Sequence, residues 1–164
     1  MQPTVESHAP LTARDPSAWP RSSEALGAAV AALGSVLHGW VGAAVLVADP
    51  QGTLQLVAAG DRRLAQALVA ELAHGDGLCH AVHRTGRMQV RRRDAAPLIG
   101  VRPLTSLCAL PLHGSADGPS GVLVLASDDD QEPDQAACVP ARLLASLAGL
   151  ALATTPAAAP LPPA

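Results

Sequence analysis

Apolar residues recur every three to four positions near the start of the patterned part of the chain. This spacing predicts a helix over Glu24–Leu37, with Ser22 or Ser23 as its N-cap. The segment before it carries four prolines among polar residues and shows little periodicity. We therefore expect a disordered leader over 1–21 and a domain over 22–153.

The next segment, VGAAVLVADPQGTLQLVAA, has the pattern of a β-hairpin. A continuous apolar run ends at Ala48, the residues DPQG supply turn chemistry, and the segment after them alternates with a period of two. A strand that is apolar at every position is typical of burial on both faces. We therefore expect helices on both sides of the sheet.

Two short helices are predicted next, over Leu64–Leu72 and from Leu78 to about Arg84. The sequence Gly-Asp-Gly at 75–77 separates them. Gly86 follows the second helix at the position where a left-handed glycine cap commonly ends a helix.

The remainder alternates strand and turn signals and closes with an apolar helix. We expect strands over Arg87–Arg91, Thr105–Leu112 and Gly121–Ser127, the last two joined by a long turn, and a final helix over Val139–Ala153. The predicted fold class is α/β, with a central, mostly antiparallel sheet and helices on both faces. The Pro- and Ala-rich end, 154–164, is expected to be an extended, disordered tail.

The composition restricts the kinds of ligand that the chain could bind and indicates its cellular location. The 164 residues are 49% hydrophobic but include no Phe or Tyr and only two Trp, so the domain offers few platforms for ring stacking. A net charge of −3 gives no general attraction for nucleic acid or an anionic membrane, and neither is expected as a direct partner. The N-terminus lacks a secretory pattern, and the longest apolar runs are too short to cross a bilayer. We expect a cytoplasmic protein.

The three cysteines do not form a recognisable framework. They lack a C-x-x-C spacing, which argues against a zinc ribbon, and their odd number argues against a disulfide scaffold. Cys79 and His83 lie four apart on one predicted helix, so a thiolate–imidazole pair or two metal ligands are open alternatives. A zinc site needs three or four protein ligands, and no further partner has a recognisable spacing. We therefore expect no metal site and no catalytic residue here, and a cysteine that packs as a small hydrophobe.

Four segments in this order resemble a GAF domain. They are the hairpin VGAAVLVADPQGTLQLVAA, the turn, helix and strand GDGLCHAVHRTGRMQV, the hairpin SLCALPLHGSADGPSGVLVLAS, and the closing Leu-rich helix. The closest subgroup is the sensory half of actinobacterial regulators that join a GAF domain to an RNA-binding ANTAR domain. In that subgroup too, a cysteine follows the glycine–acid–glycine turn and R-T-G closes the helix. The chain ends in TTPAAAPLPPA where an ANTAR unit would follow, so antitermination is not expected of it.

The resemblance implies a ligand pocket between the sheet and the segment 60–103. The residues expected to line it are Val45, Leu78, Cys79, Val82, Leu107 and Ala109. The resemblance leaves the identity of any ligand or cofactor unknown. It also implies that the first and last helices pair on the opposite face and support a homodimer or a contact with a signalling partner.

Arginines crowd the segment after the second short helix. Arg87 and Arg91 are candidate contacts for an anionic ligand, because guanidinium groups bind carboxylate and phosphate through charge-assisted hydrogen bonds. The alternative is a solvated strand end with no ligand.

Three functions follow, in decreasing order of expectation. The first is a non-enzymatic regulatory domain that senses a small molecule. The second is an interaction or dimerisation scaffold with an empty pocket. The third is an enzyme that reduces free methionine sulfoxide, since some GAF proteins do so and Cys79 matches one of their cysteines. Their other reactive cysteines have no counterpart here, because the segments 60–77 and 92–106 contain none.

Overall fold

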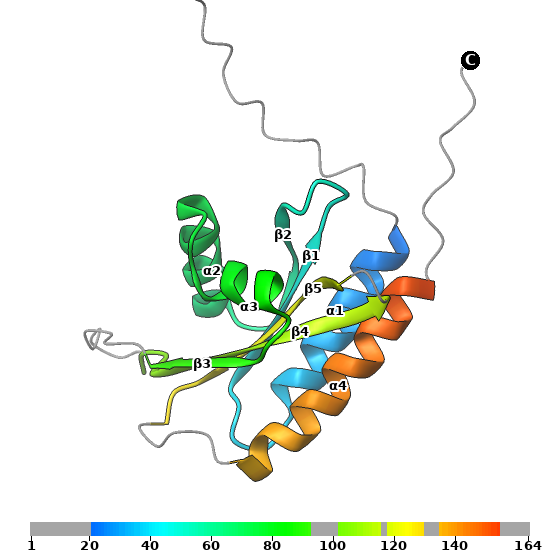
Figure 1. The fold of residues 1–164 in the computed structure, drawn as a ribbon. Helices are drawn as coiled ribbons and strands as arrows, with labels where there is room; N and C mark the ends of the chain where they lie inside the picture. Colours follow the sequence, from blue (N-terminus) through cyan, green and yellow to red (C-terminus); the bar gives the residue numbers. More distant parts are fainter. Residues whose placement is uncertain (1–20, 93–101, 116–117, 130–134, 155–164) are drawn as a thin grey trace, which may run out of the picture.

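The computed structural model describes residues 21–92, 102–115, 118–129 and 135–154 (Figure 1). The leader expected over 1–21 and the tail expected over 154–164 therefore lie outside the described residues, except for their innermost positions. Most of the loop expected between 92 and 103 does so as well.

A five-stranded antiparallel sheet forms the centre of the domain. Its order is β2-β1-β5-β4-β3, so the first hairpin and the last hairpin meet where β1 pairs with β5. The strands are β1 (Gly42–Ala48), β2 (Leu54–Ala59), β3 (Gln89–Arg92), β4 (Ser106–Ser115) and β5 (Gly118–Ser127).

Helices cover both faces of this sheet (Figure 1). The first and last helices, α1 (Arg21–Ser35) and α4 (Gln135–Thr154), lie side by side on one face. The two short helices, α2 (Arg62–His74) and α3 (Leu78–Thr85), lie on the other. The expected fold class, with its order of helices and strands, is confirmed.

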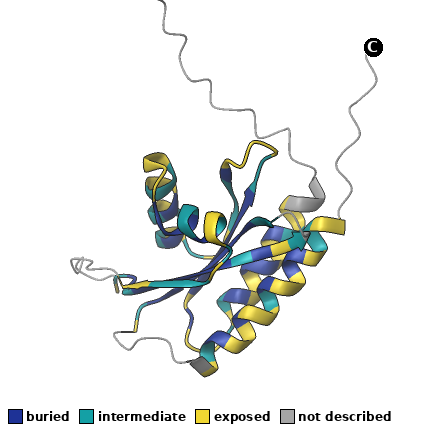
Figure 2. Cartoon of the chain, viewed as in Figure 1, coloured by how far each residue is buried: buried dark blue, intermediate teal, exposed yellow. Residues whose placement is uncertain are grey.

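The sheet separates two apolar clusters, and burial is concentrated along it (Figure 2). In β1, Ala43, Val45 and Val47 belong to the cluster under α1 and α4, while Ala44 and Leu46 belong to the cluster under α2 and α3. The strand is buried on both faces as its continuous apolar run predicts.

Several boundaries differ from the prediction. The first helix begins at Arg21, so Ser22 and Ser23 lie inside it and not at the position before it. In the last hairpin the strands extend beyond their expected ends to Ser115 and from Gly118, with irregular pairing around His113, so the long turn is replaced by a longer hairpin. The polar residues of this segment give no strand pattern in the sequence. In the structure, backbone pairing nevertheless extends both strands through it.

The last helix is longer than expected and begins at Gln135, before Pro140. Proline lacks an N–H group, so one intrahelical hydrogen bond is missing there, near the helix start. With this extension, 136–154 is long and apolar enough by length and composition to cross a membrane, with a mean hydropathy of 1.7. The expectation that no run is long enough is therefore wrong. The packing of α4 against β4 accounts for part of its apolar character, because its buried residues face the sheet.

Candidate functional site

The glycine–acid–glycine turn joins α2 to α3, and its two glycines have different roles. Gly75 ends α2 with a φ of 77°, a left-handed conformation that glycine adopts without strain. Gly77 precedes α3, and a Cβ atom at this position would overlap the carboxyl group of Glu71. Glycine at 77 thus lets the Glu71 side chain reach the start of α3.

Glu71 serves as the cap of α3 from outside the helix. Its Oε1 atom accepts a hydrogen bond of 2.8 Å from the backbone N–H of Cys79, while Gly77 offers no side chain for capping. A carboxylate at a helix N-terminus is also favoured by the helix dipole. The contact fixes the end of α2 relative to α3 on this face of the sheet.

The opposite end of α3 is closed as the sequence predicts. Gly86 has a φ of 64° and donates its N–H to the carbonyl of Val82 at 2.8 Å. The hydroxyl of Thr85 donates to the carbonyl of Ala81 at 2.8 Å. The Arg-Thr-Gly sequence therefore turns the chain toward β3.

A cavity of about 240 Å³ lies between the second half of α2 and the β3–β4 edge. Its apolar wall consists of Ala67 and Ala70 from α2 and Leu107 from β4, and three ionisable side chains complete the lining. These are Glu71, His74 and Arg91. His74 and Arg91 come from different elements and bring nitrogen donors to one small, partly apolar space.

The orientation of His74 follows from a contact with its own helix. Its Nδ1 atom lies 2.6 Å from the carbonyl oxygen of Ala70, so Nδ1 carries the proton that is shared in this hydrogen bond. The second ring nitrogen, Nε2, then accepts hydrogen bonds in the neutral ring and donates them only when the imidazole is protonated.

Cys79 lies behind this cavity as a protonated thiol. Burial raises the pKa of its thiol strongly, and the charge and hydrogen bond of Glu71 raise it further, while the charge of Arg91 acts in the opposite direction. The thiolate is the reactive form of cysteine, so these surroundings do not favour a nucleophile. The hydrogen bond from its backbone N–H to Glu71 places Cys79 next to the cavity lining.

The structure brings together five of the six expected pocket residues. Leu78, Cys79, Val82, Leu107 and Ala109 share the cluster under α2 and α3. Val45 does not join them, because its side chain lies under α1 and α4. That part of the prediction is wrong: an unbroken apolar strand carries no alternation that would identify its inner face.

Four of the five residues belong to this cluster without lining the cavity. Only Leu107 lines the cavity itself. The two candidate arginines also separate. Arg91 lines the cavity, whereas Arg87 lies exposed between α3 and β3, outside the lining.

Sequence reasoning missed the α2 residues that shape the cavity. Glu71 and Cys79 are eight positions apart across a turn, and no local periodicity links them. The local signal for this contact is the glycine at position 77, because the absence of a side chain there lets Glu71 approach the start of α3.

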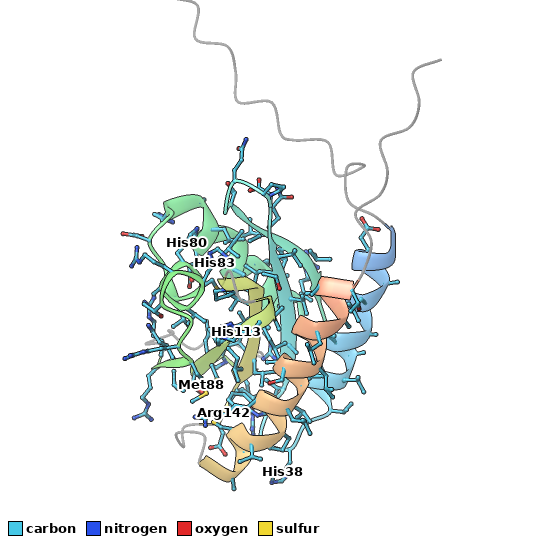
Figure 3. The ribbon with its side chains drawn as sticks, turned by 45° about the vertical axis from the view of Figure 1, so that its right-hand side comes forward. His38, His80, His83, Met88, His113 and Arg142 are labelled. Atoms are coloured by element: carbon cyan, nitrogen blue, oxygen red, sulfur yellow. The ribbon has the colours of Figure 1, made fainter. Side chains whose placement is uncertain are left out.

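The distribution of cysteines and histidines bears on metal and redox chemistry. In the part of the chain that the structure describes, no group of three or more His, Cys, Asp or Glu is placed to hold a metal ion. Figure 3 shows His80 and His83 on α3 and His113 on β4, so two of these three histidines share a helix and the third lies on a strand. The sheet separates Cys79 from the other two cysteines, which lie in the cluster under α1 and α4.

Solved structures supply a comparison for this arrangement. The GAF domain of a protein classed as a sensor histidine kinase from Pseudomonas syringae pv. tomato aligns with a TM-score of 0.55 at 25% identity, over 82% of this chain and 77% of that one. The GAF-B domain of DevS from Mycobacterium smegmatis aligns with a TM-score of 0.59 at 21% identity, over 79% and 91%. The fold is that of a GAF domain.

The same GAF fold also occurs in an enzyme among the similar structures. A type II free methionine-R-sulfoxide reductase from Thermoplasma acidophilum aligns with a TM-score of 0.59 at 17% identity, over 80% of this chain and 94% of that one. No protein-family model matches the sequence, and no curated protein is significantly similar to it. The comparison therefore establishes the GAF fold. The activity has to be inferred from the residues of the site.

Proposed function

We propose that this chain is a cytoplasmic, non-enzymatic sensory domain of GAF type, which binds a small organic anion in the cavity between α2 and the β3–β4 edge. The observation that carries this proposal is the convergence of Arg91 and His74 on that cavity. A guanidinium group donates hydrogen bonds to a carboxylate or phosphate, and an imidazole whose Nδ1 proton is already donated does so through Nε2 in its protonated form. The alanines of α2 and Leu107 would contact the apolar part of the same ligand.

The size of the cavity restricts the ligand. Its volume of about 240 Å³ is below the usual range of roughly 300–1,000 Å³ for drug-sized ligands. Among the described residues that line it, none is aromatic, which disfavours a large planar cofactor. A short carboxylic acid or a small phosphate ester fits these limits.

The comparison with GAF domains of sensor proteins supports a sensory role. Within that class, Cys79 and the sequence Arg84-Thr85-Gly86 support the more specific proposal of a sensory half like those of GAF–ANTAR regulators. The enzymatic alternative is disfavoured by the surroundings of Cys79. Its thiol is protonated, and the sheet separates it from both other cysteines, so it has no neighbouring thiol with which to complete a disulfide relay.

A second feature supports a signalling assembly. The outer face of α4 exposes Leu143, Leu147 and Leu150, each more than half accessible to solvent. Their spacing of four and three residues is the repeat of a coiled-coil seam, in which a helix pairs with a similar helix. We therefore include a homodimer through α4 and the adjacent α1 in the proposal; a scaffold that uses this face without any ligand is the second candidate.

The ligand proposal is tested by binding. We expect a thermal-shift screen of small mono- and dicarboxylates and phosphate esters to raise the melting temperature of the full chain. For the best compound, Arg91→Ala should weaken the Kd by about tenfold or more, because a charge-assisted hydrogen bond is lost.

Arg87→Ala is the matched control, since Arg87 is an exposed arginine outside the cavity. It should leave the Kd unchanged. If no acid stabilises the wild type, or if both variants weaken binding equally, the cavity is not an anion site and the scaffold is favoured.

A further inference from the structure

The cavity beside α2 is lined by charges of opposite sign that come from two elements. Glu71 and His74 lie on α2, on the same helix face as the two alanines of the lining. Arg91 lies on β3, opposite Leu107 of β4 in the strand register. The helix therefore brings a carboxylate and an imidazole to the cavity, and the edge of the sheet brings a guanidinium group.

These opposite charges are not paired with each other. Among the residues that the structure describes, Glu71 and Arg91 form no ion pair with one another, although both line the same space. The Oε1 atom of Glu71 accepts a hydrogen bond of 2.8 Å from the backbone N–H of Cys79. A carboxylate offers about four lone-pair sites, so Glu71 can accept further hydrogen bonds from a ligand.

Glu71 disfavours a ligand that carries only negative charge. A carboxylate bound by Arg91 would share a small space with the Glu71 carboxylate, and like charges repel more strongly where water is partly excluded. An ammonium group on the same ligand reverses the sign of this interaction. It would donate to Glu71, and also to Nε2 of the neutral His74 ring, whose Nδ1 already donates to the carbonyl of Ala70.

We propose that the ligand of this cavity is a free α-amino acid with a small aliphatic side chain. Its carboxylate binds the guanidinium group of Arg91, and its ammonium group binds Glu71 and Nε2 of His74. This inference rests on the proposed anion site and narrows its ligand to carboxylates that also carry an ammonium group.

The apolar part of the lining restricts which amino acid fits. Ala67, Ala70 and Leu107 contribute aliphatic side chains to the cavity. In an α-amino acid both charged groups are attached to one carbon atom and the side chain projects away from them, so the side chain can contact this wall. The volume of about 240 Å³ favours a short side chain, such as that of alanine or valine, over an aromatic one.

Matched ligands test the need for both charged groups. L-Valine, isovalerate and isobutylamine share one aliphatic skeleton, but isovalerate lacks the ammonium group and isobutylamine lacks the carboxylate. We expect isothermal titration calorimetry of the full chain to give a Kd for L-valine at least about tenfold lower than for either other compound, because each of those loses one charge-assisted contact. L-Alanine and propionate should differ in the same direction.

Glu71→Gln tests the side chain that distinguishes these ligands. Glutamine keeps an oxygen that can accept the Cys79 N–H, so the cap of α3 is retained while the charge is removed. The Kd for L-valine should rise about tenfold, whereas the Kd for isovalerate should not rise. Asp76→Asn is the matched control, because it removes the same charge from an exposed position outside the lining, and it should leave both values unchanged.

The possible results separate this inference from the anion site on which it rests. Isovalerate that binds as tightly as L-valine, or a Glu71→Gln variant that weakens both ligands equally, would overturn the amino-acid ligand and leave the anion site in place. Isobutylamine that binds as tightly as L-valine would show that the carboxylate is not recognised, and would overturn both. Wild-type protein that binds none of these compounds would also overturn both.

Discussion

At the scale of single residues, individual side chains stabilise the fold through specific hydrogen bonds. Asp61 is an example: it precedes α2 and accepts hydrogen bonds from the backbone N–H groups of Arg63 and Leu64. It also forms an ion pair with the Arg63 guanidinium at 2.8 Å. This cap explains why α2 begins at Arg62, two residues before the start expected from apolar spacing.

We predict that Asp61→Ala lowers the free energy of unfolding by about 1 kcal/mol at neutral pH, because α2 loses its cap. The hydrogen bond from Arg63 lowers the pKa of the Asp61 carboxyl below its usual value, despite partial burial. A lowered pKa in the folded state contributes stability above the unfolded-state pKa of about 3.9, and this contribution is lost as the pH falls through the folded-state value.

Urea unfolding as a function of pH measures this contribution. Asp61→Asn keeps an oxygen acceptor but removes the charge, so its deficit relative to wild type should be present at pH 7 and disappear below the folded-state pKa. A deficit that is constant with pH would show that the charge of Asp61 contributes nothing.

At the scale of elements, the packing of α4 on the sheet depends on small residues. Gly149 lies against β4, where a Cβ atom would approach the His113 backbone nitrogen to 2.7 Å and crowd its carbonyl group. A Cβ atom at Gly114, on the strand, would similarly lie 2.6 Å from the carbonyl oxygen of Gly149. Helix and strand therefore approach backbone to backbone at this point.

We predict that Gly149→Ala destabilises the protein by roughly 1–3 kcal/mol, because backbone atoms cannot move aside cheaply. In an exposed helix the same change would stabilise by up to about 1 kcal/mol, so the sign of the effect identifies the contact. Ser146→Ala, at an exposed position of α4, is the control and should be close to neutral. Chemical denaturation of the wild type and the two variants measures these changes. A Gly149→Ala protein that is more stable than the wild type would contradict the close packing.

At the scale of the whole molecule, one face of α4 packs on the domain while the other presents leucines to solvent. A soluble domain commonly covers such a stripe by association. The proposed homodimer should therefore depend on Leu143 and Leu147, which are 62% and 57% accessible in the single chain.

We predict that Leu143→Glu combined with Leu147→Glu converts the dimer to a monomer in sedimentation experiments, since paired carboxylates would be buried without partners. Val69→Glu is the matched control. Val69 is 58% accessible but lies on α2, on the other side of the sheet, and its substitution should leave the dimer intact. A wild-type chain that sediments as a monomer at every concentration would contradict the homodimer and direct attention to a different partner.

Much of the fold follows from local signals, and therefore from the sequence itself. The hairpin of β1 and β2 is specified by an apolar run, a turn and an alternating run, and the end of α3 by a glycine at 86. These features depend on the conformations of a few consecutive residues, which turn chemistry and periodicity describe directly. The burial of β1 on both faces belongs to the same group.

The tertiary structure alone decided which residues meet. The continuous apolar pattern of β1 could not place Val45 on the face of α1 and α4, because every position is equally apolar. The contact of Glu71 with Cys79 and the meeting of His74 with Arg91 at one cavity join separate elements. Such pairings depend on sheet order and helix packing, and no spacing along the chain encodes them.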